Sequence, residues 1–235
     1  MSRNATRFLA IGLLLLGGGL VFRANAAANT ATIASKVRAA TGPDAPLPVA
    51  GTVAAQESAV FAGGCFWGVQ AVFQHTKGVI SARSGYAGGD GESANYQQVS
   101  SGQTLHAEAV RVVYDPSKVS YETLLNIFFS VVHDPTQLNM QGPDHGPQYR
   151  SEVFTTNAAQ QTATEQYINK LSVAKVFNAP IVTKVSPLTK FYEAEKYHQD
   201  YATLNPNDMY IVINDAPKVE ALKKQFPAFY RAELK

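Results

Sequence analysis

Residues 58–73 read SAVFAGGCFWGVQAVF, and this stretch decides the fold. Its first half, SAVFAGG, is a short apolar run that ends in glycines, which predicts a buried strand. The second half, CFWGVQAVF, predicts a short helix. Gly63 and Gly64 permit a tight turn between the two elements. Cys65, the only cysteine of the chain, is therefore expected where the strand gives way to the helix.

This position favours a reactive thiol. Backbone N–H groups and the macrodipole at a helix N-terminus favour negative charge, which lowers the pKa of a thiol and raises its thiolate fraction. The alternative is that Cys65 is a small buried hydrophobe, the commoner fate of a free cysteine. Phe66 and Trp67 are either core aromatics or an apolar wall beside the thiol, suited to a methyl or thioether group.

Working outward, strand and helix patterns alternate. Strands are predicted over residues 79–85, 106–116, 151–156, 179–185 and 209–215. Helices are predicted from a Ser120 cap to residue 132, and over residues 157–173, 191–204 and 217–226. Gly-rich loops are expected over residues 86–104 and 141–150. The interleaving indicates one domain in which helices cover a sheet, and it leaves the strand order open.

Composition excludes several classes of protein. Hydrophobic residues make up 46% and charged residues 16% of the 235 residues, as in a globular protein with a core. The net charge is +2 without a Lys/Arg block, so we expect no nucleic-acid binding. A single cysteine can form neither an intramolecular disulfide nor a Cys-based zinc cluster. The five histidines do not fall at metal-ligand spacings, and no phosphate-binding glycine loop follows a strand, so we expect no metal and no cofactor.

The N-terminus resembles an export signal. Arg3 and Arg7 precede the apolar run of residues 8–21, and Ala24-Asn25-Ala26 follows as a small-x-small cleavage signature. We expect residues 1–26 to be a signal peptide and the protein to be exported, to the periplasm of a bacterium. An uncleaved membrane anchor is the alternative, although the run is shorter than the roughly 20 apolar residues of a membrane span.

Between the signal and the fold lies a stretch rich in Ala, Thr and Pro. Residues 27–54 lack sustained periodicity, and we expect a flexible tether. Pro43, Pro46 and Pro48 argue against a helix there. The folded domain is expected over residues 55–235.

An ordered set of motifs carries a specific resemblance. They are GGCFWG, GYAGG, NYQQVSSG, HAEAV, YDP, HDPTQ and DHGPQYRS between Phe61 and Ser151, extended by KYHQDY and NP between Tyr197 and Pro206. This set resembles the methionine-S-sulfoxide reductase A family. The resemblance implies an α+β fold, a two-layer sandwich around a mixed, ferredoxin-like sheet. It also implies reduction of methionine-S-sulfoxide, protein-bound and free, in the repair of oxidised proteins.

The resemblance assigns a role to each matching residue. Cys65 would attack the sulfoxide sulfur, and Glu108 would protonate its oxygen. Tyr96 and Tyr149 would hydrogen-bond that oxygen. Phe66 and Trp67 would accept the methyl group, and Asp144 would help to bind the backbone side of the substrate.

The acid role demands an uncharged Glu108. A sulfoxide oxygen leaves only once it is protonated, so the carboxyl needs a pKa above its ordinary value of about 4.3. Burial raises it by disfavouring the charged form. On an alternating strand Glu108 shares a face with Val110 and Val112, which should point it into the apolar layer. The alternative is a surface glutamate at a strand start.

The sequence departs from many relatives after the first step. Some members carry a second cysteine where Ser100 stands, and this chain has none to attack a Cys65 sulfenic acid. We therefore expect reduction from outside, by a thioredoxin-like or glutaredoxin-like protein or by a small thiol. We expect a monomer.

Two other functions are open at this point. A Cys-His hydrolase would use Cys65 as acyl acceptor with His106 or His198 as base. A non-catalytic, exported peptide-binding module would merely pack Cys65.

Overall fold

The computed structural model describes residues 33–42 and 56–234. The expected signal peptide, residues 1–26, lies outside these ranges. So does most of the expected tether, but residues 33–41 form a helix, and Val37 is fully buried against the core. The expectation of a structureless tether is wrong for this segment, because the three prolines all follow the helix, which ends before Gly42. Within the described ranges, no helix has the length and apolar character that crossing a membrane requires.

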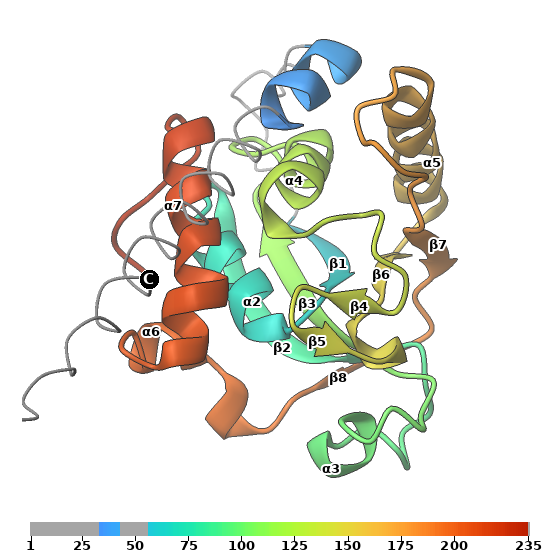
Figure 1. The fold of residues 1–235 in the computed structure, drawn as a ribbon, viewed down its shortest axis with the longest axis vertical. Helices are drawn as coiled ribbons and strands as arrows, with labels where there is room; N and C mark the ends of the chain where they lie inside the picture. Colours follow the sequence, from blue (N-terminus) through green and yellow to red (C-terminus); the bar gives the residue numbers. More distant parts are fainter. Residues whose placement is uncertain (1–32, 43–55, 235) are drawn as a thin grey trace, which may run out of the picture.

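A six-stranded mixed sheet forms the centre of the domain (Figure 1). Its strands are β1 (Glu57–Gly63), β2 (Val79–Ala87), β3 (Ala107–Tyr114), β6 (Ser151–Thr155), β7 (Lys184–Pro187) and β8 (Phe191–Glu193). Their order is β7-β6-β1-β3-β2-β8, and every neighbouring pair is antiparallel except β6 and β7. The inner order β6-β1-β3-β2 is the split β-α-β arrangement of a ferredoxin-like fold. A separate two-stranded ribbon pairs β4 (Met140–Gln141) with β5 (Asp144–His145).

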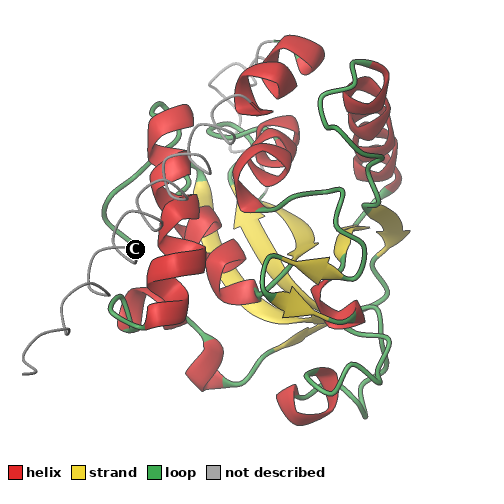
Figure 2. Cartoon of the chain, in the orientation of Figure 1, coloured by secondary structure: helices red, strands yellow, loops and turns green. Residues whose placement is uncertain are grey.

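The longer helices lie over one face of this sheet, while the short helix Tyr96–Val99 lies below the sheet in this view (Figures 1 and 2). The helices are α2 (Phe66–Gln74), α3 (Tyr96–Val99), α4 (Tyr121–Ile127), α5 (Ala158–Val173), α6 (Tyr201–Leu204) and α7 (Ala216–Gln225). A π-helical turn, Phe128–Val132, continues α4, and another, Ile211–Asp215, runs into α7. Short 3-10 turns span Pro147–Tyr149 and Lys196–His198.

Alternation along the central strands separates two apolar layers. On β1, Phe61 belongs to the large core under the helices and stacks on Phe73 of α2 with ring centroids 5.0 Å apart. Its neighbour Ala62 points to the opposite face, where a smaller cluster is covered by Leu188 and Phe191. The large core therefore lies between β1, β3 and the helices, and α2 runs from the end of β1 across that core.

Side-chain caps start two of the helices, and the first of these caps, Ser120, was expected from the sequence. The Ser120 hydroxyl accepts a hydrogen bond from Thr123 N–H (3.0 Å) at the start of α4. The Asn157 side chain accepts one from Gln160 N–H (2.9 Å) at the start of α5. These bonds satisfy N–H groups that have no partner inside the helix.

Four expected elements differ from the structure, and three of them lie in the C-terminal third. Residues 209–215 were expected as a strand but are helical, and burial of Ile211 and Asp215 follows a helical spacing. Residues 191–204 were expected as one helix, yet Phe191–Glu193 pairs with the edge of β2 and Asp200 takes a left-handed backbone conformation (φ 60°) that interrupts it. The strand expected over residues 179–185 begins only at Lys184, and the loop expected over residues 86–104 contains α3 and the end of β2.

We predict that Asn157→Ala lowers the free energy of unfolding by about 1 kcal/mol, because Gln160 N–H loses its partner. Urea denaturation measures the change. Gln161→Ala, on the exposed side of the same first turn, is the matched control and should cost much less. Equal losses in both variants would contradict a capping role.

Candidate active site

Cys65 lies at the start of α2, as the sequence predicts. It is the N-cap residue of that helix, and 9% of it is exposed. Gly64 before it has φ +93°, and a Cβ added there would lie 2.6 Å from the side chain of Gln141. Only glycine fits both the backbone conformation and this close approach of the β4–β5 ribbon. The thiol therefore lies where the end of β1, the start of α2 and the β4–β5 ribbon meet.

The pKa of the Cys65 thiol is raised well above its ordinary value, chiefly because burial disfavours the thiolate. The nearby carboxyls of Glu108 and Asp215 raise it further, while a backbone hydrogen bond from Trp67 and the ammonium of Lys218 lower it by less. The expectation that the helix N-terminus lowers this pKa is therefore wrong for the ligand-free protein. The backbone at the start of α2 lowers the pKa of the thiol, but the loss of hydration on burial raises this pKa by more.

Glu108 lies on β3 and is 2% exposed. Its Oε2 atom accepts a hydrogen bond from the backbone N–H of Phe66, the residue after Cys65 (3.1 Å). Burial raises the pKa of its carboxyl from 4.5 to about 8, although the hydrogen bond from Phe66 opposes the rise. The side chain is therefore a carboxylic acid at neutral pH, as the sequence predicts, and the surface alternative is wrong.

Phe66 and Trp67 form an aromatic group next to the thiol. Phe66 is 1% exposed and packs near Tyr86 with ring centroids 5.9 Å apart. Trp67 is half-buried, stacks on Tyr201 at 3.8 Å between ring centroids, and donates a hydrogen bond from Nε1 to His198 Nδ1 (3.1 Å). Phe66 is thus a core residue as well as a neighbour of the thiol, while Trp67 remains partly exposed.

The structure brings the two expected tyrosines and Asp144 into the same region. Burial raises the pKa of Tyr149 most, and Glu108, Asp144, Cys65 and Tyr96 raise it further. The pKa of Tyr96 is raised by burial and then by Glu108 and Cys65. Both phenols are therefore neutral donors at physiological pH.

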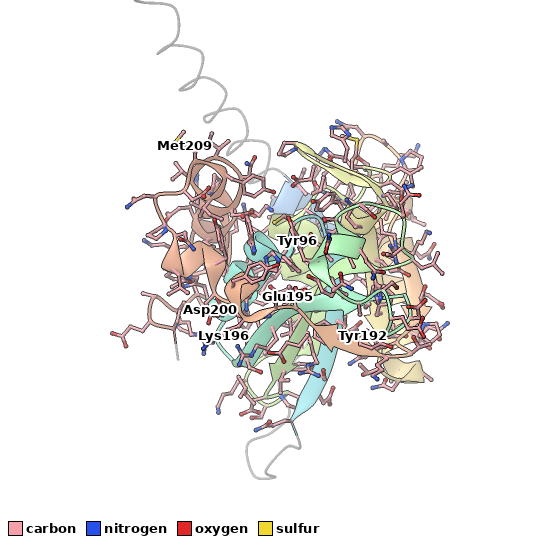
Figure 3. All side chains as sticks on the ribbon, turned by 90° about the horizontal axis from the view of Figure 1, so that it is seen from below. Tyr96, Tyr192, Glu195, Lys196, Asp200 and Met209 are labelled. Carbon is pink, nitrogen blue, oxygen red and sulfur yellow. The ribbon has the colours of Figure 1, made fainter. Side chains whose placement is uncertain are left out.

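The backbone N–H of Tyr96 donates to Glu195 Oε1 (2.8 Å), and the two residues lie beside each other in Figure 3. Tyr86 OH donates to the other oxygen of the same carboxylate (2.7 Å). Glu195 thereby holds the loop of Tyr96 against the sheet. Neither Tyr86 nor Glu195 was singled out from the sequence.

The C-terminal segment supplies further residues that sequence reasoning missed. Tyr210 OH donates a hydrogen bond to Asp144 Oδ2, which ties the segment before α7 to the β4–β5 ribbon. Asp215 is fully buried and pairs with Lys218 (3.1 Å) against the backbone of Gly68, where a side chain would collide with the pair. Because this segment was expected as a strand, its tyrosine and carboxylate could not be placed near Cys65.

The geometry does not favour a Cys-His hydrolase. In the described part of the chain, no hydrogen bond joins Cys65 to a histidine. The ring of His106 is held by the carbonyl of Asp90 (2.7 Å), and the Nδ1 atom of His198 is occupied by Trp67. His133 bonds Ser151 Oγ (2.7 Å), and burial lowers its pKa to about 4. Residues 33–42 and 56–234 contain no group of three or more His, Cys, Asp or Glu side chains that could hold a metal ion.

Comparisons with known proteins show which family this chain resembles. The family model described as peptide methionine sulfoxide reductase matches residues 57–229. The peptide methionine sulfoxide reductase MsrA 2 of Mesorhizobium japonicum is 58% identical over 174 residues, which cover 74% of this chain and 89% of the relative. The MsrA 2 of Synechocystis sp. is 46% identical over 186 residues, 79% of this chain and 87% of the relative.

Solved structures show the same architecture. Methionine sulfoxide reductase A of Corynebacterium diphtheriae has a TM-score of 0.56 and 34% identity, covering 70% of this chain and 83% of that protein. Reduced Mxr1 from Saccharomyces cerevisiae has a TM-score of 0.61 and 32% identity, covering 65% of this chain and 87% of that protein. The expected α+β class with a mixed sheet is confirmed.

The raised pKa of Glu108 predicts a pH-dependent stability. The folded protein keeps a proton that the unfolded chain releases near pH 4.5, so the contribution of Glu108 is fully present below that pH and is lost as pH rises to about 8. Relative to Glu108→Gln, the wild-type protein should therefore lose free energy of unfolding across this window. Denaturant titrations at a series of pH values measure the difference. Glu92→Gln, at an exposed carboxylate, is the control, and parallel curves for wild type and Glu108→Gln would refute the assignment.

Proposed function

This chain belongs to the peptide methionine sulfoxide reductase family, and on that premise we propose that Cys65 reduces the S-epimer of methionine sulfoxide while Glu108 protonates the departing oxygen. The protein is an oxidoreductase that reduces methionine sulfoxide in protein repair. The observation that carries the proposed roles is the burial of Glu108, which raises its pKa to about 8, together with its hydrogen bond from the backbone of the residue after Cys65.

Two protons take part in this step, one from the Cys65 thiol and one from the Glu108 carboxyl. The sulfur of Cys65 attacks the sulfoxide sulfur as the thiol proton leaves, and Glu108 places its own proton on the sulfoxide oxygen. The S–S bond made by this attack and the S–O bond of the substrate then both break as the hydroxyl passes to the Cys65 sulfur, and methionine departs as a thioether. Cys65 becomes a sulfenic acid, so its sulfur is oxidised by two electrons and the substrate sulfur is reduced by two. Glu108 recovers a proton equivalent to the one that left the thiol.

The remaining residues hold the substrate. Tyr96 and Tyr149 are neutral donors that stabilise charge developing on the oxygen. Phe66 and Trp67 offer apolar surface to the methyl group. Asp144, fixed by Tyr210, binds the backbone side of a peptide or of free methionine sulfoxide.

An external thiol completes the cycle. Cys65 is the only cysteine, so no second thiol of this chain can attack the sulfenic acid. One reductant thiol forms a mixed disulfide with Cys65 and releases water, and a second thiol frees Cys65. A thioredoxin-like or glutaredoxin-like protein or a small thiol fits this chemistry. We further propose that the protein acts in the bacterial periplasm, because residues 1–26 resemble an export signal. We also propose that it acts as a monomer.

We predict that one equivalent of a methionine-S-sulfoxide peptide, without reductant, yields one methionine per protein and adds one oxygen atom to Cys65. Mass spectrometry of the Cys65 peptide measures the addition, and dimedone trapping identifies the sulfenic acid. Cys65→Ser should release no methionine. Turnover of the Cys65→Ser variant with dithiothreitol would contradict the nucleophile assignment.

We also predict that Glu108→Gln slows single-turnover reduction roughly 10²- to 10⁴-fold, the contribution typical of a general acid. The loss should be largest near neutral pH, and the wild-type rate should fall as pH rises through about 8, where Glu108 ionises. Quenched-flow measurement of methionine release tests both effects, with Glu92→Gln as control. A Glu108→Gln rate equal to that of wild type would remove Glu108 from the acid role.

A further inference from the structure

The indole of Trp67 is held from two sides. Tyr201 stacks on it with ring planes 12° apart, and Tyr210 meets it edge-on at 5.9 Å between centroids. The indole donates a hydrogen bond from Nε1 to His198 Nδ1 (3.1 Å). Stacking fixes the plane of the indole, and the hydrogen bond fixes its rotation within that plane.

This hydrogen bond sets the chemical state of His198. An indole nitrogen can only donate, so Nδ1 must accept and carry no hydrogen. The neutral ring then carries its hydrogen on Nε2. Nε2 is buried and has no hydrogen-bond partner in the part of the chain that the structure describes, and His198 is 2% exposed. Within those residues, Trp67 alone therefore selects the tautomer.

His198 also contacts the other walls of the site. Its ring centroid lies 5.0 Å from Phe66 and 4.4 Å from Tyr96. The next residue, Gln199, anchors this turn to β2: its Nε2 donates to Ser84 O (2.9 Å) and its Oε1 accepts from Ser84 N–H (3.0 Å). The imidazole therefore has a fixed position, in contact with the rings of Phe66, Trp67 and Tyr96.

We propose that His198, in its neutral Nε2–H form, is a positioning residue that orients the indole of Trp67 as the wall of the substrate pocket. This inference rests on the proposed function for the role of that wall. The hydrogen bond itself stands independently of it.

The surroundings of His198 determine its protonation. Burial lowers its pKa below 6.5, and the carboxylate of Glu195 opposes that shift. Tyr96 of α3 and Tyr197 face the ring as neutral phenols, and Lys196 precedes Tyr197 in the 3-10 turn that contains His198. From α2 the ring meets only the uncharged rings of Phe66 and Trp67. Protonation of Nδ1 would set a hydrogen against the indole N–H and break the bond.

Trp67 is the only tryptophan, so tryptophan fluorescence reports on the surroundings of this one indole, and a change at His198 isolates the contribution of this contact. The experiment titrates the emission of the full-length protein from pH about 8 down to about 4. Wild type should show a transition centred below pH 6.5. His198→Asn keeps an acceptor that does not titrate, so the transition should vanish. His75→Asn, outside the site, should retain it. A transition that persists in His198→Asn would overturn the proposal.

Kinetic measurements then distinguish a positioning role of His198 from a direct role in the reaction. His198→Leu removes the acceptor, and kcat/KM for a methionine sulfoxide peptide should fall about threefold to tenfold, the effect of one hydrogen bond. His198→Asn should recover part of this loss, while the rate of Cys65 alkylation by iodoacetamide should be unchanged in both variants. Wild-type kcat/KM and emission in a folded His198→Leu protein would overturn the proposal. Absence of reductase activity in the wild type, with the emission transition intact, would instead overturn the proposed function.

Discussion

The hydrogen bond from Phe66 N–H to Glu108 joins the first turn of α2 to the start of β3. It forms because the glycine turn after β1 starts α2 directly above the neighbouring strand, and because alternation along β3 points Glu108 into the layer between sheet and helices. The backbone donor and the carboxyl share a site from which water is largely excluded. Cys65 stands one residue before this contact, so the geometry that buries the acid also buries the nucleophile.

Burial favours the protonated form of both the Glu108 carboxyl and the Cys65 thiol. It raises the pKa of Glu108 to about 8 and the pKa of Cys65 well above its ordinary value. The resting site therefore holds both protons, one of which the proposed reaction moves to the sulfoxide oxygen. A thiol kept protonated also resists adventitious oxidation, because the thiolate is the reactive form. Activation then depends on a substrate that brings an oxygen able to accept a proton.

The sequence was most informative where local pattern and tertiary structure agree. The strand, turn and helix around Cys65, the inward direction of Glu108 and the Ser120 cap all follow from periodicity and side-chain chemistry. The placement of Tyr96 and Tyr149 near Cys65 rested on a family resemblance, since long loops carry no periodicity.

What the sequence missed depends on contacts between distant segments. The run around Ile211 alternates like a strand but is helical, because it packs beside α2 rather than at a sheet edge. Consequently Tyr210 and Asp215 could not be assigned to the site. The pKa of Cys65 was misjudged for a related reason: a helix N-terminus can be read from a sequence, but the exclusion of water by the β4–β5 ribbon and the C-terminal segment cannot.

The protonation state of Glu108 in the ligand-free protein is the most direct test. Infrared difference spectra between wild type and Glu108→Gln, recorded across the pH range, isolate its carboxyl band. A protonated carboxylic acid at pH 7 that ionises near pH 8 is the predicted result. A carboxylate already present at pH 7, titrating near the ordinary value of about 4.3, would contradict the central role of burial.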